Sequence, residues 1–111
     1  MRFDEIASML NGILGTNKCA YYQWPEEKAP NLPYILFYYP SSNDECADNT
    51  NYASITNLNI ELYTKTKDFD TERKVETVLK ANGLVYEKSE QYINQEDMYE
   101  VLYESEVVID G

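Results

Sequence analysis

Apolar residues recur at spacings of three and four near the start of the chain, which predicts an amphipathic helix. This helix is expected to end near Gly12 to Gly15, and Asp4 and Glu5 favour its N-terminus through the helix macrodipole. The buried stripe consists of Phe3, Ile6, Ala7, Leu10, Ile13 and Leu14.

A second helix is predicted after a turn at residues 65–70, where Asp68 or Asp70 can cap its first turn. It runs to Ala81, and Gly83 supplies the left-handed residue that commonly ends a helix. Its expected buried side consists of Phe69, Val75, Val78 and Leu79, while Glu72 and Glu76 are expected to point outward.

Residues 34–39 are aromatic or aliphatic and predict a strand, framed by Pro33 and Pro40. Both faces of this strand are apolar, so both are expected to be covered. One face would lie on the core. For the other face, a helix and a neighbouring subunit are both possible covers.

The later strands alternate between apolar and polar residues. Leu58, Ile60 and Leu62 share one face of their strand and polar residues share the other, which is typical of a sheet with one solvated face. Further strands are predicted at residues 19–22, 84–92 and 98–109. In the last of these, Glu100, Glu104 and Glu106 lie opposite Tyr99, Val101, Tyr103, Val107 and Ile109.

These elements predict one α+β domain covering residues 1–111. We expect a mostly antiparallel sheet backed by two helices, in the order α-β-β-β-α-β-β.

The net charge is −11, from 20 acidic and nine basic residues, and acidic residues concentrate in the last 25 positions. Such a chain should repel DNA phosphates and anionic membrane surfaces. No apolar run approaches the roughly 20 residues that a membrane-spanning helix requires. We therefore expect a cytosolic chain without membrane contact.

Few side chains suit catalysis. The chain has no histidine, so the usual general base is missing. Glu104 and Glu106 could form an acid and base pair, but such residues are far more often a solvated strand face. We expect no enzyme, no catalytic residue and no cofactor, since the four glycines form no phosphate-binding loop.

Metal binding is not expected either. Asp44, Glu45 and Asp48 lack the glycine and the distal glutamate of a calcium loop at the required spacing. Cys19 and Cys46 are expected to be reduced thiols, with a bridge between them as the less favoured alternative.

Eleven tyrosines are many for 111 residues. Tyrosine suits strands, and it is also enriched at protein interfaces. The polar loop at residues 40–51 is a second candidate for protein contacts, because long loops are usually functional or disordered. The candidate contact residues are Tyr39, Asp44, Asp48, Asn49, Tyr52, Tyr63 and Tyr92.

The order and spacing of several short motifs over residues 30–108 resemble the tail-completion proteins of long-tailed bacteriophages and prophages. This family includes tail terminators, head-to-tail joining proteins and minor capsid proteins. The resemblance is carried by Leu32-Pro33-Tyr34-Ile35, Ala47-Asp48-Asn49 with Tyr52, Ile60-Glu61-Leu62-Tyr63-Thr64 with Lys67-Asp68, the helix from Glu72 to Leu79, Tyr92-Ile93, Met98-Tyr99, and Val101 with Tyr103-Glu104.

The resemblance implies a structural virion protein that forms a homo-oligomeric ring, commonly a hexamer, at the head-proximal end of the tail. The ring would end tube polymerisation and join the tail tube to the head connector, and the chain would be cytoplasmic in the host before assembly. The genome would pass through without specific binding. We expect Glu100, Glu104 and Glu106 to line the lumen, and the contact residues above to meet a neighbouring subunit or the tail tube.

A small acidic DNA mimic that inhibits a host DNA-processing enzyme is the alternative. It needs carboxylates arrayed across one surface in place of phosphates. The balanced charge of the central third of the sequence argues against such an array.

Overall fold

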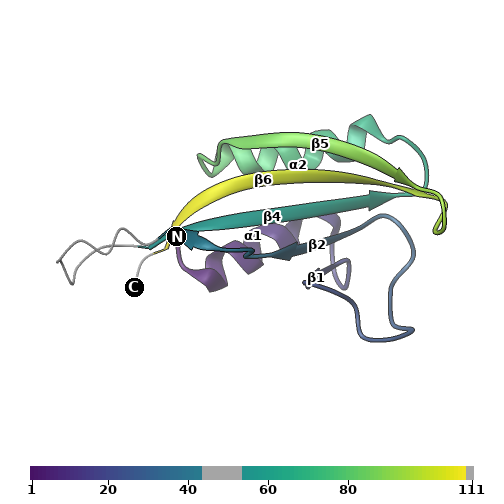
Figure 1. Ribbon diagram of the computed structural model, residues 1–111, viewed down its shortest axis with the longest axis horizontal. Helices are drawn as coiled ribbons and strands as arrows, with labels where there is room; N and C mark the ends of the chain where they lie inside the picture. Colours follow the sequence, from purple (N-terminus) through teal and green to yellow (C-terminus); the bar gives the residue numbers. More distant parts are fainter. Residues whose placement is uncertain (44–53, 110–111) are drawn as a thin grey trace.

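The computed structural model describes residues 1–43 and 54–109, which form a twisted sheet backed by two helices (Figure 1). The predicted α+β class and element order are confirmed, and the structure adds a two-residue strand, β3. The elements are α1 (Phe3–Leu14), β1 (Cys19–Tyr21), β2 (Tyr34–Tyr38), β3 (Ser42–Asn43), β4 (Ser54–Thr64), α2 (Phe69–Ala81), β5 (Tyr86–Ile93) and β6 (Met98–Ile109).

The helix α1 follows most of its predicted apolar stripe, but Phe3, at its first residue, is 51 % exposed and packs its ring against that of Tyr39. Ile6 and Leu10 are fully buried in the core. The Glu5 carboxylate accepts a hydrogen bond from the backbone nitrogen of Arg2 at 2.7 Å, which satisfies a donor at the helix N-terminus. Gly15 follows the helix at φ 97°, a conformation that glycine adopts without strain.

The helix α2 begins and ends as predicted. Asp68, one of the two predicted caps, accepts hydrogen bonds from the backbone nitrogen of Thr71 at 3.0 Å and from its hydroxyl at 2.6 Å. Gly83 lies just beyond the helix at φ 74°, in the left-handed conformation that ends many helices.

Three side chains of α2 differ from the prediction. Glu76, which was expected to point outward, is half-buried and accepts a hydrogen bond from the Tyr103 hydroxyl of the sheet. Phe69 was expected to be buried but is 66 % exposed, because it lies at the first turn with the Lys67 ammonium group 4.8 Å from its ring centre. Glu72 was expected to point outward but is 1 % exposed. Lysines from outside the helix neutralise it, as described below.

The strands lie in the order β1-β2-β4-β6-β5, with β3 paired to β4. All neighbouring pairs are antiparallel except β1 and β2, which run parallel. The extra strand β3 arises because the chain after Pro40 continues along β4 in the same direction as β2, and Asn57 donates a hydrogen bond from its backbone to the Ser41 carbonyl at 2.9 Å. The side chain of Asn57 also donates to the Ser41 hydroxyl at 2.6 Å.

The main core lies between the helices and one face of the sheet. Its buried residues come from both helices, from β2, β4 and β6, and from the segment after α2. They are Ile6, Leu10, Ile35, Phe37, Leu58, Ile60, Leu62, Val75, Leu79, Leu84, Val101, Tyr103, Val107 and Ile109.

A smaller apolar cluster covers one end of the opposite face. Leu36, Tyr63 and Met98 are buried there, and Trp24 and Leu32 from the connection between β1 and β2 pack against them. The second apolar face of β2 is therefore covered by a segment of the same chain. The cover is thus neither a helix nor a neighbouring subunit, which were the two possibilities that the sequence left open for this strand.

Candidate acidic face of the sheet

The sheet face away from the helices, which we call the acidic face, carries several glutamates. Side chains alternate along each strand, and the register places Glu61 of β4, Glu87 of β5, and Glu100, Glu104 and Glu106 of β6 on this face. Among the described strand residues that share this face, none is lysine or arginine. The negative charge is therefore not balanced locally.

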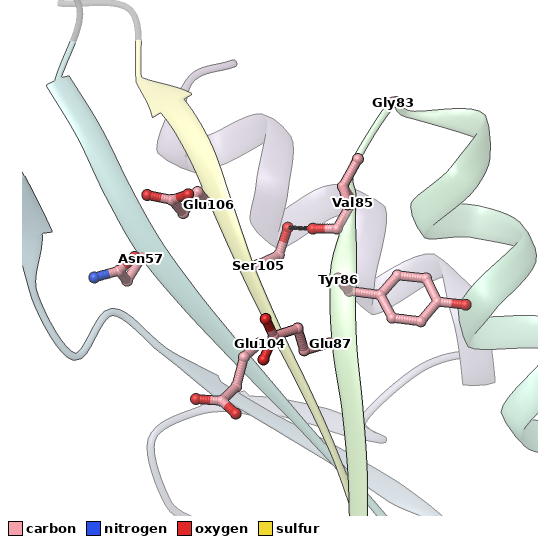
Figure 2. A pocket seen from close by; sticks show the side chains of 8 residues that line it. All are labelled: Asn57, Gly83, Val85, Tyr86, Glu87, Glu104, Ser105 and Glu106. Carbon is pink, nitrogen blue, oxygen red and sulfur yellow. Dashed lines mark hydrogen bonds between the residues drawn. The ribbon is translucent and has the colours of Figure 1, made fainter.

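The exposed part of the acidic face has like charges side by side. Glu87 lies directly opposite Glu104 on the neighbouring strand, and Glu106 follows two residues later. Like charges in such a pair destabilise a sheet. Their carboxylates surround a shallow hollow of about 470 Å³ that Asn57 and Val85 also line (Figure 2). An arrangement that costs stability points to a use for the charge.

The inner part of the acidic face contains a shared hydroxyl group. The Tyr63 hydroxyl lies 2.8 Å from a Glu61 carboxylate oxygen and 2.7 Å from a Glu100 carboxylate oxygen. A hydroxyl has one hydrogen to donate, so it satisfies only one ionised carboxylate at a time. Both contacts of the Tyr63 hydroxyl can be hydrogen bonds when one of the two glutamates carries a proton. Gln91 donates a hydrogen bond to the other oxygen of Glu100 at 2.5 Å.

Glu61 is the member of this pair that favours the proton. Burial raises its pKa, hydrogen bonds from Tyr63 and Tyr38 lower it, and the negative charge of Glu100 raises it, with a raised pKa as the net result. Burial and the hydrogen bonds to both glutamates raise the pKa of Tyr63, so its hydroxyl stays neutral.

The helix side of the sheet carries a group of ion pairs around the buried Glu72. One oxygen of its carboxylate lies 2.6 Å from the Lys67 ammonium and the other lies 2.8 Å from that of Lys88. Lys88 also pairs with Glu76 at 2.7 Å, and Glu76 accepts a hydrogen bond from the Tyr103 hydroxyl at 2.8 Å. We call these five residues the α2–β5 clamp.

Burial disfavours the charged forms of Lys67, Lys88 and Glu76, but the contacts that these residues make outweigh this effect. Burial lowers the pKa of Lys67 and of Lys88, and the bonds that each makes to its glutamates outweigh this, so both pKa values are raised. For Glu76, burial raises the pKa, and the bonds from Lys88 and Tyr103 outweigh it and lower the pKa. These contacts favour the charged forms of Lys67, Lys88 and Glu76, whereas burial and the bond to Glu76 raise the pKa of Tyr103, so its hydroxyl stays neutral.

The predicted lumen residues divide into two kinds. Glu104 and Glu106 are exposed on the acidic face, as a lining requires. Glu100 is only 9 % exposed, because the Tyr63 and Gln91 side chains occupy its carboxylate. Glu61 and Glu87 belong to the same face and were not predicted as lumen residues. The alternation that placed polar residues opposite Leu58, Ile60 and Leu62 was the signal for Glu61.

The predicted contact residues lie apart from one another. Tyr92 is exposed, and its hydroxyl donates to the Asp97 carboxylate. Tyr39 is half-buried beside Phe3 and Tyr21. Tyr63 is buried within its own chain, so the structure does not bring it to a free surface. The remaining four, and Cys46, lie outside the described residues: Asp44, Asp48, Asn49 and Tyr52.

The described residues offer little that could support catalysis. Burial raises the pKa of the Cys19 thiol to about 12, so this free thiol stays protonated and is a poor nucleophile. Within residues 1–43 and 54–109, no three histidine, cysteine, aspartate or glutamate side chains come together as metal ligands.

The comparisons with known proteins add no family to this description. No helix in the described part of the chain is both long and apolar enough to cross a membrane. The sequence matches no protein-family model and no curated protein.

Proposed function

We propose that this protein is a non-enzymatic virion component of a long-tailed phage or prophage. It forms a ring, a hexamer in the simplest case, at the head-proximal end of the tail. There it ends polymerisation of the tail tube and joins the tail to the head connector. Its partners are its own copies, the tail tube and the connector, and it resides in the host cytoplasm before assembly.

The observation that carries the proposal is the acidic face. Glu87, Glu104 and Glu106 are exposed there, and no lysine or arginine of the described strands lies on the same face. A lumen lined by such a face repels DNA phosphates, so the genome passes without binding. The motifs over residues 30–108 and the helix-backed sheet support the same assignment.

A native mass measurement of the purified chain, followed by electron cryomicroscopy of the particle, tests the proposal. We expect a discrete ring in which Glu104 and Glu106 face the central channel. A chain that stays monomeric or dimeric, alone and with tail tubes, would overturn the ring. A ring with both glutamates on its outer rim would overturn the role of the acidic face.

One observation favours a second candidate, the DNA mimic. Glu61 comes from the charge-balanced central third of the sequence, yet the fold places it on the same face as the glutamates of the C-terminal hairpin. The carboxylates therefore do form an array on one surface, as mimicry requires. A monomer that binds a DNA-processing enzyme through Glu87, Glu104 and Glu106 would establish this function instead.

A further inference from the structure

The large apolar side chains that remain exposed gather at the two edges of the sheet. Phe3, Tyr21 and Tyr22 lie at the β1 edge, and Val85 and Tyr92 lie at the β5 edge. The two edges are on opposite sides of the molecule (Figure 1). Of the other large apolar side chains exposed in the described chain, Phe69 lies under a lysine and Val108 lies on the acidic face.

The β1 edge is surrounded by aromatic rings, which we call the aromatic edge. Successive rings lie 4.9 to 6.5 Å apart between their centres, which is the range of favourable aromatic contacts. The rings lie on both sides of β1. They belong to Phe3, Tyr39, Tyr21, Tyr22 and Tyr38.

No charged residue protects the β1 edge. Its strand and the residue that follows read Cys-Ala-Tyr-Tyr, and β1 pairs only with β2 among the described strands. Proteins usually guard an edge strand with charges, prolines or bulges, because unpaired backbone groups recruit another strand. Surfaces rich in tyrosine are typical of protein interfaces.

The β5 edge offers a matching surface. β5 has eight residues and pairs only with β6, so its outer backbone groups are open along the whole strand. Val85 precedes β5 directly and is 86 % exposed. Glu87 and Glu90 on β5 have the opposite charge to Lys18, which precedes β1.

The register brings the two edges to the same level. One row of paired residues runs across the sheet from Tyr21 through Phe37, Ile60 and Tyr103 to Lys88. Continued into a second copy, this row places Tyr22 level with Glu87, and Val85 lies two residues from Glu87 on the same face, roughly 7 Å along the strand. β1 and β5 run in opposite directions. If two copies stand side by side in the same orientation, β1 of one copy is therefore antiparallel to β5 of the next copy.

We infer that the aromatic edge of one copy binds the β5 edge of the next copy, with Val85 packed against Tyr22. Such a contact joins two different surfaces of the same chain, so repeating it gives a ring where the rotation between copies closes and an open filament where it does not. It also keeps every sheet in the same orientation, with all helices on one side of the ring wall and all acidic faces on the other. This inference rests on the proposed function and names the subunit contact within it.

Cross-linking between single-cysteine variants tests the contact. Tyr22→Cys and Val85→Cys are made separately in a Cys19→Ala, Cys46→Ser background, and both replaced side chains are largely exposed, so the fold should be retained. Mixing the two variants with a short bismaleimide should give covalent dimers. A chain with both substitutions should give a ladder that ends at the mass of the ring.

A matched pair of variants provides the control. Glu104→Cys replaces an exposed residue of the acidic face and should not cross-link to Val85→Cys in another copy. Equal cross-linking of the control pair would overturn the inference. If native mass spectrometry shows a ring but Tyr22→Cys and Val85→Cys do not cross-link, the contact is wrong and the ring remains. If no ring forms under any condition, the proposed ring and the inferred subunit contact are both wrong.

Discussion

At the residue scale, the pair formed by Glu61 and Glu100 makes stability depend on pH. The folded state raises the pKa of Glu61 above its ordinary value of 4.5. Its stabilising contribution is therefore fully present below about pH 4.5 and is lost as the pH rises through the raised value. At neutral pH the Glu61 charge opposes folding.

Glu61→Gln should remove this pH dependence, because the amide stays neutral and can donate to Tyr63 or Glu100. We expect its free energy of unfolding to exceed that of the parent chain by about 1 kcal/mol near neutral pH. The gain should vanish where Glu61 is protonated in both states. Urea unfolding at about pH 4 and about pH 7 measures the difference.

Glu104→Gln is the matched control, since Glu104 is exposed on the same face and makes no hydrogen bond with Tyr63. It relieves only the solvent-screened repulsion from Glu87, so its gain at neutral pH should be smaller than that of Glu61→Gln. A Glu61→Gln variant that tracks the parent chain at both pH values would show that the pair shares no proton.

At the scale of elements, the clamp around Glu72 fixes α2 against β5. Glu72→Gln leaves Lys67 and Lys88 facing a neutral amide in a buried position. Breaking a buried ion pair costs several kcal/mol, and the two lysines are partly solvated, so we expect a loss of about 2 kcal/mol in the free energy of unfolding. Urea unfolding at neutral pH measures it.

Glu90→Gln is a suitable comparison because Glu90 pairs with the same lysine, Lys67, at 2.6 Å but is largely exposed. We expect its loss to stay below about 0.5 kcal/mol. Equal losses in the two variants would mean that the burial of Glu72 does not strengthen the clamp.

The same elements show how far the sequence predicts the structure. The apolar stripe of α1 apart from Phe3, the Asp68 cap and the alternation in β4 and β6 depend on neighbours along the chain, and these were predicted correctly. Glu72 was not, because its environment is set by Lys67 and Lys88, which approach from outside the helix. Local periodicity contains no information about such partners.

The acidic face was likewise predicted only where it depends on neighbours along the chain. Alternation along β6 placed Glu104 and Glu106 on a solvated face, and the structure agrees. It could not show that Tyr63 and Glu100, 37 positions apart, would meet in a buried hydrogen bond. Such contacts depend on the register between β4 and β6, which the sequence pattern does not specify.

At the scale of the whole molecule, every copy carries a net charge of −11, so copies repel one another at long range. Edges joined by aromatic and backbone contacts must overcome this repulsion. Salt screens it, and raising the ionic strength from roughly 0.05 M to roughly 0.5 M should increase the fraction of chains in rings. Sedimentation velocity across this range measures the fraction.

The Glu87→Gln, Glu104→Gln, Glu106→Gln triple variant should form rings at lower salt than the parent chain, because it carries less charge. A DNA mimic predicts the opposite trend, since a complex held by opposite charges weakens as salt rises. Assembly that declines with salt would contradict edge contacts as the main source of ring stability.

The small cluster on the acidic side of the sheet also contains the only tryptophan of the chain. The ring of Trp24 lies 5.6 Å from that of Tyr34, and its indole nitrogen is buried. The fluorescence of this one residue therefore reports on the connection between β1 and β2 and not on the main core. A red shift of its emission that precedes the loss of circular dichroism would show this connection leaving the sheet while the helices remain folded.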